Sequence, residues 1–335
     1  MMKTPIVYTL ISSEKDYFLE ELWVSLYSLR QFHPEVTVNV LVDEPTKKYV
    51  ERFPELCAMI TNIVVVPVPE NYNAKQRSRV IKTTVRNVID GAYLFIDTDT
   101  VICKPLDDID NLTCDIAAVP EEHLQLKDLT FSPVNGIKNV FGVDISDSKF
   151  WFNSGVMFVA DTDAARKLYH DWNKKWEFSC FQKGQSQDQP ALSVANKESN
   201  MLISELPGIY NSQVAMSLKY FADAAIVHWW HMSFIENQDY SPFFSLQIYK
   251  DVKTAKGLTA DIKELIKHCK QSFVSPTMPV GKEHIYFLFS PAGKIFNRIY
   301  KEGGAASFLM NKCAAVLEKI HKYTKKNDFS SNTFI

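Results

Sequence analysis

Three pairs of aspartates, each separated by a single residue, are the first candidates for chemistry in this chain of 335 residues. They are Asp97 with Asp99, Asp108 with Asp110, and Asp161 with Asp163. Carboxylate oxygens suit hard cations such as Mn²⁺ or Mg²⁺, and such a cation can bridge the two phosphates of a leaving diphosphate. Because the same form occurs three times, the tripeptide alone is weak evidence, and its surroundings must decide.

The surroundings favour the first pair. The pair at 161 and 163 precedes a predicted helix, where Asp is expected as an N-cap and a first-turn residue. The pair at 108 and 110 stands in a polar turn, another ordinary place for Asp. Asp97 and Asp99 instead interrupt an apolar segment, where two like charges are costly without a cation. They also follow a predicted strand, at the edge where open α/β sheets bind ligands.

The elements that must position this pair alternate between strand and helix over residues 5–120, which is typical of an α/β domain with a largely parallel sheet. Leu19, Leu22, Trp23 and Leu26 follow the spacing of one buried helical face. A second helix is predicted at about residues 76–89. Runs of β-branched and aromatic residues predict strands at 6–11, 36–42, 63–66, 93–96 and 116–119.

The segment 121–150 has weak periodicity and several turn formers, so we expect a long excursion from the sheet. Regular patterns return as a strand at 156–159, a helix at 164–176, a helix after Pro190 and a strand at 224–229. We therefore predict a main domain of residues 1–240 and a mainly helical extension of residues 241–335.

Composition excludes several classes of protein. The net charge of −2 gives no support for nucleic-acid binding. There are only eleven glycines and no Gly-rich loop follows a predicted strand, which argues against dinucleotide-binding and P-loop proteins. The six cysteines are scattered, as expected for reduced thiols. No apolar segment is long enough to span a bilayer and the N-terminus does not resemble a signal peptide, so we expect a cytoplasmic protein.

The sequence resembles a known family over most of residues 5–232. The segments that carry the resemblance, in this order, are 93–99 (YLFIDTD), 152–156 (FNSGV), 188–189 (DQ) and 226–228 (IVH). Together they look like a GT-A glycosyltransferase, closest to the retaining family 8 type with glycogenin and bacterial lipopolysaccharide glucosyl- and galactosyltransferases. This resemblance implies a Rossmann-like, mostly parallel sheet flanked by helices, and transfer of a hexose from a UDP-sugar to a glycan or lipid-linked acceptor.

The resemblance implies a metal site for Mn²⁺ or Mg²⁺ formed by Asp97, Asp99 and His228. Imidazole is acceptable to Mn²⁺ beside oxygen ligands. A hydrogen-bonded histidine at a strand end is the structural alternative for His228, and His231 is a competing ligand.

Donor contacts are implied on three segments. Arg79 and Lys82 match the place of a basic contact to the donor, although they could belong to a solvated helical face with Lys75, Arg77 and Arg86. The other residues expected at the donor are Thr9, Leu10, Ser12, Tyr17, Thr98, Asn153, Ser154 and Gly155. Glycine at the last position would allow close backbone approach, and an ordinary strand-entry turn is the alternative.

Asp188 and Gln189 match the pair that faces the anomeric carbon and the sugar hydroxyls. A structural role is the alternative, because Asp before Pro190 can simply start a helix. Cleavage of the bond between the anomeric carbon and the phosphate leaves negative charge on the diphosphate and oxocarbenium character on the sugar. The metal and Arg79 would therefore stabilise the diphosphate, and Asp188 or Gln189 the sugar.

Residues 282–326 hold nine Lys or Arg against three Glu, so the C-terminal segment is basic. Leu309, Cys313, Val316 and Leu317 lie on one predicted helical face. One interpretation is a terminal helix packed on the main domain. The other, equally weighted, is that this helix with Tyr286, Phe287, Phe289 and Phe296 contacts the inner face of an anionic membrane.

Two other functions compete with sugar transfer. A nucleotidyltransferase that makes activated sugars uses a similar sheet, but such enzymes commonly show a Gly-rich basic segment after the first strand, and residues 9–16 are not one. A non-catalytic sugar-binding protein, with Asp97 and Asp99 as surface turn residues, is the third hypothesis.

Overall fold

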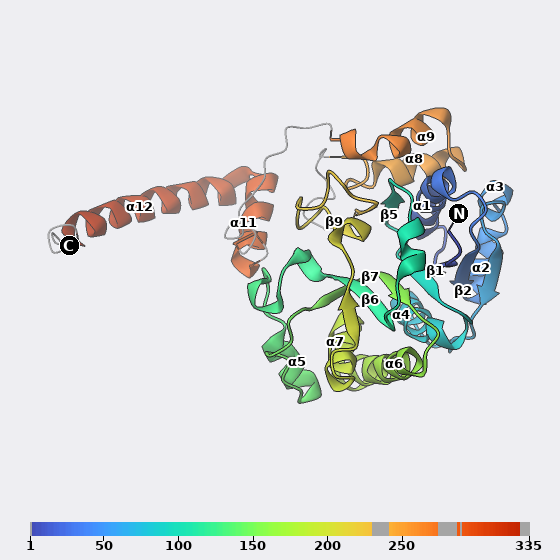
Figure 1. Ribbon diagram of the computed structural model, residues 1–335. Helices are drawn as coiled ribbons and strands as arrows, with labels where there is room; N and C mark the ends of the chain where they lie inside the picture. The colour runs from blue at the N-terminus through green and yellow to red at the C-terminus, as the bar shows by residue number, and fades with distance from the viewer. Residues whose placement is uncertain (1, 230–240, 274–286, 289, 329–335) are drawn as a thin grey trace. The chain divides into compact units, whose positions relative to one another are not determined.

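A seven-stranded sheet forms the centre of the first of two compact units, residues 1–277 and 278–335. The structure is a computed structural model and describes residues 2–229, 241–273, 287–288 and 290–328 (Figure 1). The strands follow the order β3-β2-β1-β4-β7-β6-β8. Their bounds are β1 Ile6–Leu10, β2 Val38–Val42, β3 Asn62–Val65, β4 Tyr93–Ile96, β6 Ile116–Pro120, β7 Phe152–Val159 and β8 Ile203–Glu205.

The sheet is mostly parallel, as predicted. β1, β2, β3 and β4 run parallel, and so do β6 and β8. The exception is β7, which is antiparallel to both β4 and β6. A second, three-stranded sheet has the order β5-β10-β9, with bounds β5 Thr100–Ile102, β9 Ser212–Gln213 and β10 Ile226–His228.

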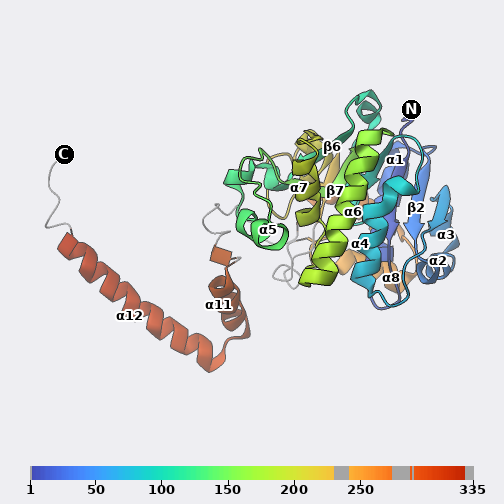
Figure 2. The same ribbon diagram turned by 90° about the horizontal axis from the view of Figure 1, so that it is seen from below.

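Alternating side chains of the strands contribute to two hydrophobic cores, one on each face of the large sheet. On one face, Ile6 and Tyr8 of β1 pack with Leu22 and Leu26 of α1 (Phe18–Phe32). The helices α8 (Gln247–Ala255) and α9 (Ala260–Lys267) contact α1 on this side. On the other face, buried side chains of β4 pack against α4 (Ala74–Thr84), α6 (Asp163–Lys183) and α7 (Gln189–Glu198), with α4 and α6 side by side (Figure 2).

Several element boundaries differ from the prediction. The predicted helix at 76–89 ends as an α-helix at Thr84 and continues as a 3-10 turn over Val85–Asn87. The N-cap of α6 is Thr162, whose hydroxyl accepts from the amide of Ala165. The strand predicted at 156–159 begins earlier, at Phe152. The excursion 121–150 contains the short helix α5 (Val134–Phe141), and α2 (Glu44–Val50) and α3 (Pro54–Cys57) follow β2.

The described part of the second unit is helical. It contains α11 (Pro291–Glu302) and α12 (Gly304–Asp328). Large apolar side chains are exposed on both helices, including Ile295, Phe308 and Leu317. Within the described part of the chain, no helix is both long and apolar enough to cross a membrane. The boundary predicted at residue 240 stays a prediction.

Candidate active site

The direction of β7 explains how two distant segments meet at one edge of the sheet. Asp97 follows β4 at its carboxyl end, whereas the antiparallel β7 begins at that edge. Ile96 pairs with Val156, and the ladder continues as the amide of Asp97 donates to the carbonyl of Gly155 at 2.7 Å. Asn153, Ser154 and Gly155 therefore lie beside the aspartate pair.

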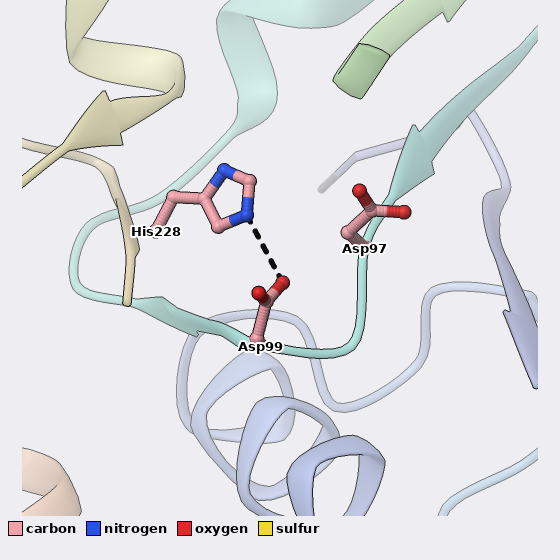
Figure 3. A group of neighbouring side chains, drawn as sticks. All are labelled: Asp97, Asp99 and His228. Carbon is pink, nitrogen blue, oxygen red and sulfur yellow. Dashed lines mark ion pairs between the residues drawn. The ribbon is translucent and has the colours of Figure 1, made fainter. Parts of the chain in front are cut away.

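The second sheet brings His228 to the same place. In the antiparallel pair of β5 and β10, His228 is opposite Thr100, the residue after Asp99. The imidazole Nε2 lies 3.0 Å from a carboxylate oxygen of Asp99. One ligand atom from each of Asp97, Asp99 and His228 lies within 4.8 Å of the others, and Figure 3 shows the three as neighbours, with the imidazole facing Asp99.

Asn211 sets the orientation of His228. Its side-chain oxygen is 3.0 Å from Nδ1 of the ring, and its amide nitrogen donates to Asn153. An amide oxygen can only accept, so Nδ1 carries the proton and Nε2 faces the carboxylates with its lone pair when the ring is neutral. Burial lowers the pKa of His228, but the charges of Asp99 and Asp97 outweigh it and raise the pKa overall. Two carboxylates and an imidazole held in this way fit a Mn²⁺ or Mg²⁺ ion.

Two basic residues of α4 contact the carboxylates. Arg79 Nε lies 2.9 Å from Asp188. Lys82 donates to both oxygens of Asp97, at 2.9 and 3.0 Å, and lies 3.9 Å from Asp188. Lys82 is only 4% exposed and Arg86 is fully buried, so the alternative of a solvated basic face is wrong for these two residues.

Asp188 does not cap the helix that it precedes. It is the N-cap residue of α7, yet its side chain makes no capping hydrogen bond. The carboxylate instead accepts from Ser154 and pairs with Arg79. Burial raises the pKa of Asp188, but the charges of Arg79 and Lys82 outweigh it, and the net pKa falls below its ordinary value. The carboxylate is therefore ionised and directed toward the site, which the role of a simple helix start does not require.

Glu121 is a site residue that the sequence analysis missed. It follows β6, is 4% exposed, and accepts hydrogen bonds from the side chains of Gln189 at 2.6 Å and Asn153 at 3.1 Å. Burial raises the pKa of its carboxyl group. Its position directly after a buried strand is the signal that identified Asp97, and the same rule applied to residue 121 would have found it.

Four of the residues expected at the donor, Thr9, Leu10, Ser12 and Tyr17, lie at the carboxyl end of β1 or in the segment that follows it. Leu10 is buried, and Thr9 is partly exposed. The hydroxyl of Ser12 donates to Asp16 and accepts from the amide of Leu19, so it stabilises the start of α1. Tyr17 lies under the ammonium group of Lys253, 4.9 Å from the ring centroid. Thr98 donates to Glu21 at 3.1 Å, and His231 lies outside the described residues.

Solved structures of other proteins have a similar architecture. WbbM, a bifunctional glycosyltransferase, is similar with a TM-score of 0.52 and 12% identity, over 77% of this chain and 52% of that one. An active-site mutant of LgtC is similar with a TM-score of 0.50 and 17% identity, over 82% of this chain and 98% of that one. The chain has the GT-A fold. No protein-family model and no curated protein matches it, so the likeness concerns the fold.

The strand order and directions of this fold explain why segments far apart in the sequence lie close together at one edge of the sheet. The edge formed by the ends of β4 and β6 and the start of β7 holds Asp97, Asn153 and the newly identified Glu121. The small sheet adds His228, and the start of α7 adds Asp188. Residues from five separate parts of the chain therefore face one another at a single edge.

Proposed function

We propose that the protein is a metal-dependent glycosyltransferase that transfers a hexose from a UDP-sugar to a glycan or lipid-linked acceptor, with retention at the anomeric carbon. The observation that carries the proposal is the convergence of Asp97, Asp99 and His228 beside the Arg79 and Asp188 ion pair. The first group fits a dication, and the second provides one positive and one negative side chain. Transfer from a sugar diphosphate needs both kinds of charge at the reacting bond.

Each group has a role that follows from its charge. A Mn²⁺ or Mg²⁺ ion bound by Asp97, Asp99 and His228 would neutralise the negative charge of the leaving diphosphate. The guanidinium of Arg79 supports the same side through hydrogen bonds to phosphate or sugar hydroxyls. Asp188, kept ionised by its basic neighbours, offsets positive charge that develops on the sugar ring. The amide of Gln189, held by Glu121, orients a sugar hydroxyl.

The similar structures support transfer of a sugar as the reaction class. WbbM is described as a bifunctional glycosyltransferase and LgtC as a galactosyltransferase. Those activities belong to those proteins. For this chain, the donor, the metal and the stereochemical course are proposals that rest on its own residues and on the resemblance stated above.

The test is turnover of nucleotide sugars by the full chain with Mn²⁺ and by matched variants. Asp97→Ala is expected to reduce metal-dependent turnover of a UDP-hexose at least about a hundredfold, because it removes a ligand of the metal. Asp108→Ala is the control, since this exposed aspartate belongs to a pair of the same form. Near-wild-type turnover in Asp97→Ala, with metal dependence retained, contradicts the assignment.

Two further assays separate the competing functions. Release of pyrophosphate from UTP and a sugar 1-phosphate would favour a nucleotidyltransferase. Metal-dependent UDP binding without turnover of any nucleotide sugar would favour a non-catalytic binding protein. The anomeric configuration of a product, measured by NMR, tests retention.

We also propose a cytoplasmic location, in part at the inner face of a membrane. All six cysteines are free thiols, as expected in a reducing compartment. In the second unit, Lys294 and Arg298 accompany the exposed apolar Ile295 on α11. Basic and apolar side chains together favour contact with anionic lipid.

A further inference from the structure

Lys82 has a buried ammonium group that already forms hydrogen bonds to Asp97, a proposed metal ligand. It donates to both carboxylate oxygens of Asp97, at 2.9 and 3.0 Å. The side chain is 5% exposed, and the ammonium lies over the ring of Phe95, 5.0 Å from its centroid. Water cannot replace these contacts in a buried position, so the charge depends on its carboxylate partners.

Asp97 cannot serve this ammonium and a dication equally well. The metal cluster uses one oxygen of Asp97, and both oxygens of that carboxylate accept from Lys82. A metal ion bound there would lie close to the ammonium group, and two cations at such a distance repel each other strongly in a buried site. Metal binding therefore requires Lys82 to weaken or leave its contact with Asp97.

A second carboxylate, that of Asp188, lies near the ammonium group of Lys82. Lys82 Nζ lies 3.9 Å from Asp188, which is also paired with Arg79. A small rotation of the flexible lysine side chain would exchange one carboxylate for the other while the charge stays paired. Asp188 faces the sugar in the proposed function, so this movement would connect the metal side of the site with the sugar side.

We infer that Lys82 is a resident counter-cation of the metal site, which holds Asp97 in the metal-free protein, competes with Mn²⁺ for it, and moves to Asp188 when the metal binds. The inference rests on the proposed metal site and adds to it. A resident cation lowers the affinity for free metal, so the ion binds best together with the negatively charged diphosphate. Lys82 is then a positioning residue that couples metal binding to donor binding.

Metal affinity without nucleotide is the decisive measurement, because removing the ammonium should strengthen binding. Mn²⁺ is titrated into the metal-free full chain and its free concentration is followed by electron paramagnetic resonance. Lys82→Met is expected to bind Mn²⁺ about tenfold tighter or more than the wild type, equivalent to at least about 1.4 kcal/mol. Lys75→Met, on the exposed side of the same helix, is expected to match the wild type.

Two variants keep the test decisive if Lys82→Met folds poorly. Lys82→Gln retains a hydrogen-bond donor for Asp97 without the charge and should also bind Mn²⁺ more tightly. Lys82→Arg retains the charge and should stay near the wild-type affinity. Equal or weaker Mn²⁺ binding by folded Lys82→Met or Lys82→Gln, beside a wild type that binds, overturns the inference alone. Absence of binding in the wild type and in every variant overturns the metal site itself.

Discussion

Gly155 offers a test of the site geometry that does not depend on catalysis. A Cβ at this position would lie 2.5 Å from Cε1 of His228 and 2.8 Å from the side-chain oxygen of Asn153. Ordinary contacts begin at 3.4 Å, so the imidazole would have to move by about 0.9 Å in Gly155→Ala. His228 is buried and held by Asn211 and Asp99, which limits such a movement.

The magnitude follows from packing. Overpacking of a buried site costs about 1–3 kcal/mol, so the free energy of unfolding of Gly155→Ala should fall by that amount. Metal sites tolerate changes of only about 0.2 Å in ligand distance, so the Mn²⁺ affinity should also fall about tenfold or more. Chemical denaturation and Mn²⁺ titration measure the two effects.

Gly136→Ala is the matched control, because nothing lies within 4 Å of a Cβ at that helical position of α5. Its stability should be unchanged or higher by up to about 1 kcal/mol, as expected for alanine in a helix. If Gly155→Ala retained both the stability and the Mn²⁺ affinity of the wild type, the close approach of the His228 ring to this strand would be refuted.

Two further predictions concern other parts of the molecule. Burial, aided by the charge of Lys219, lowers the pKa of His123 from 6.5 to about 4, so the folded state favours the neutral ring. The contribution of His123 to the free energy of unfolding is fully present above pH 6.5. It is lost as the pH falls toward 4, at up to about 1.4 kcal/mol per pH unit. His123→Gln should flatten that dependence in urea unfolding curves, and an equally steep curve in the variant would contradict it. In the C-terminal unit, Phe308→Ser with Leu309→Ser should reduce sedimentation of the full chain with phosphatidylserine vesicles, and unchanged, salt-insensitive sedimentation would argue against lipid contact.

The strands that carry the site could be predicted because their composition is strongly biased. The segment 93–96 is buried at all four positions, and the acidic pair after it stands out against that background. The other two pairs make structural contacts, although the N-cap of α6 is Thr162 and not an aspartate. Asp110 accepts from the N-terminal segment at Thr4, and Asp161 accepts from the amide of Gly91. Local sequence therefore separated the pair that lies beside His228 from two pairs that make other contacts.

Short elements and burial of charge could not be predicted in the same way. β5 and β9 have only three and two residues, too few for a periodic pattern, and they exist because they pair with β10. The basic residues of α4 and of the 3-10 turn after it have similar sequence surroundings but differ in burial, since Lys75 is exposed and Arg86 is fully buried with hydrogen bonds to backbone carbonyls. Only the packing of α4 against the sheet and α6 decides between them.

One hydrogen-bonded chain connects the proposed metal site to the proposed sugar side of the site. It runs from His228 through Asn211 and Asn153 to Glu121 and Gln189. Asn211 and Asn153 each donate to one neighbour and accept from another, and Gln189 donates to Glu121 and to the carbonyl of Phe152. Turning any of these amides would therefore break a hydrogen bond. In the proposed function, the imidazole that would bind the metal and the amide that would face the sugar are therefore fixed by the same network. Such a shared support would keep the two halves of the proposed site at a fixed separation, as cleavage of a sugar diphosphate would require.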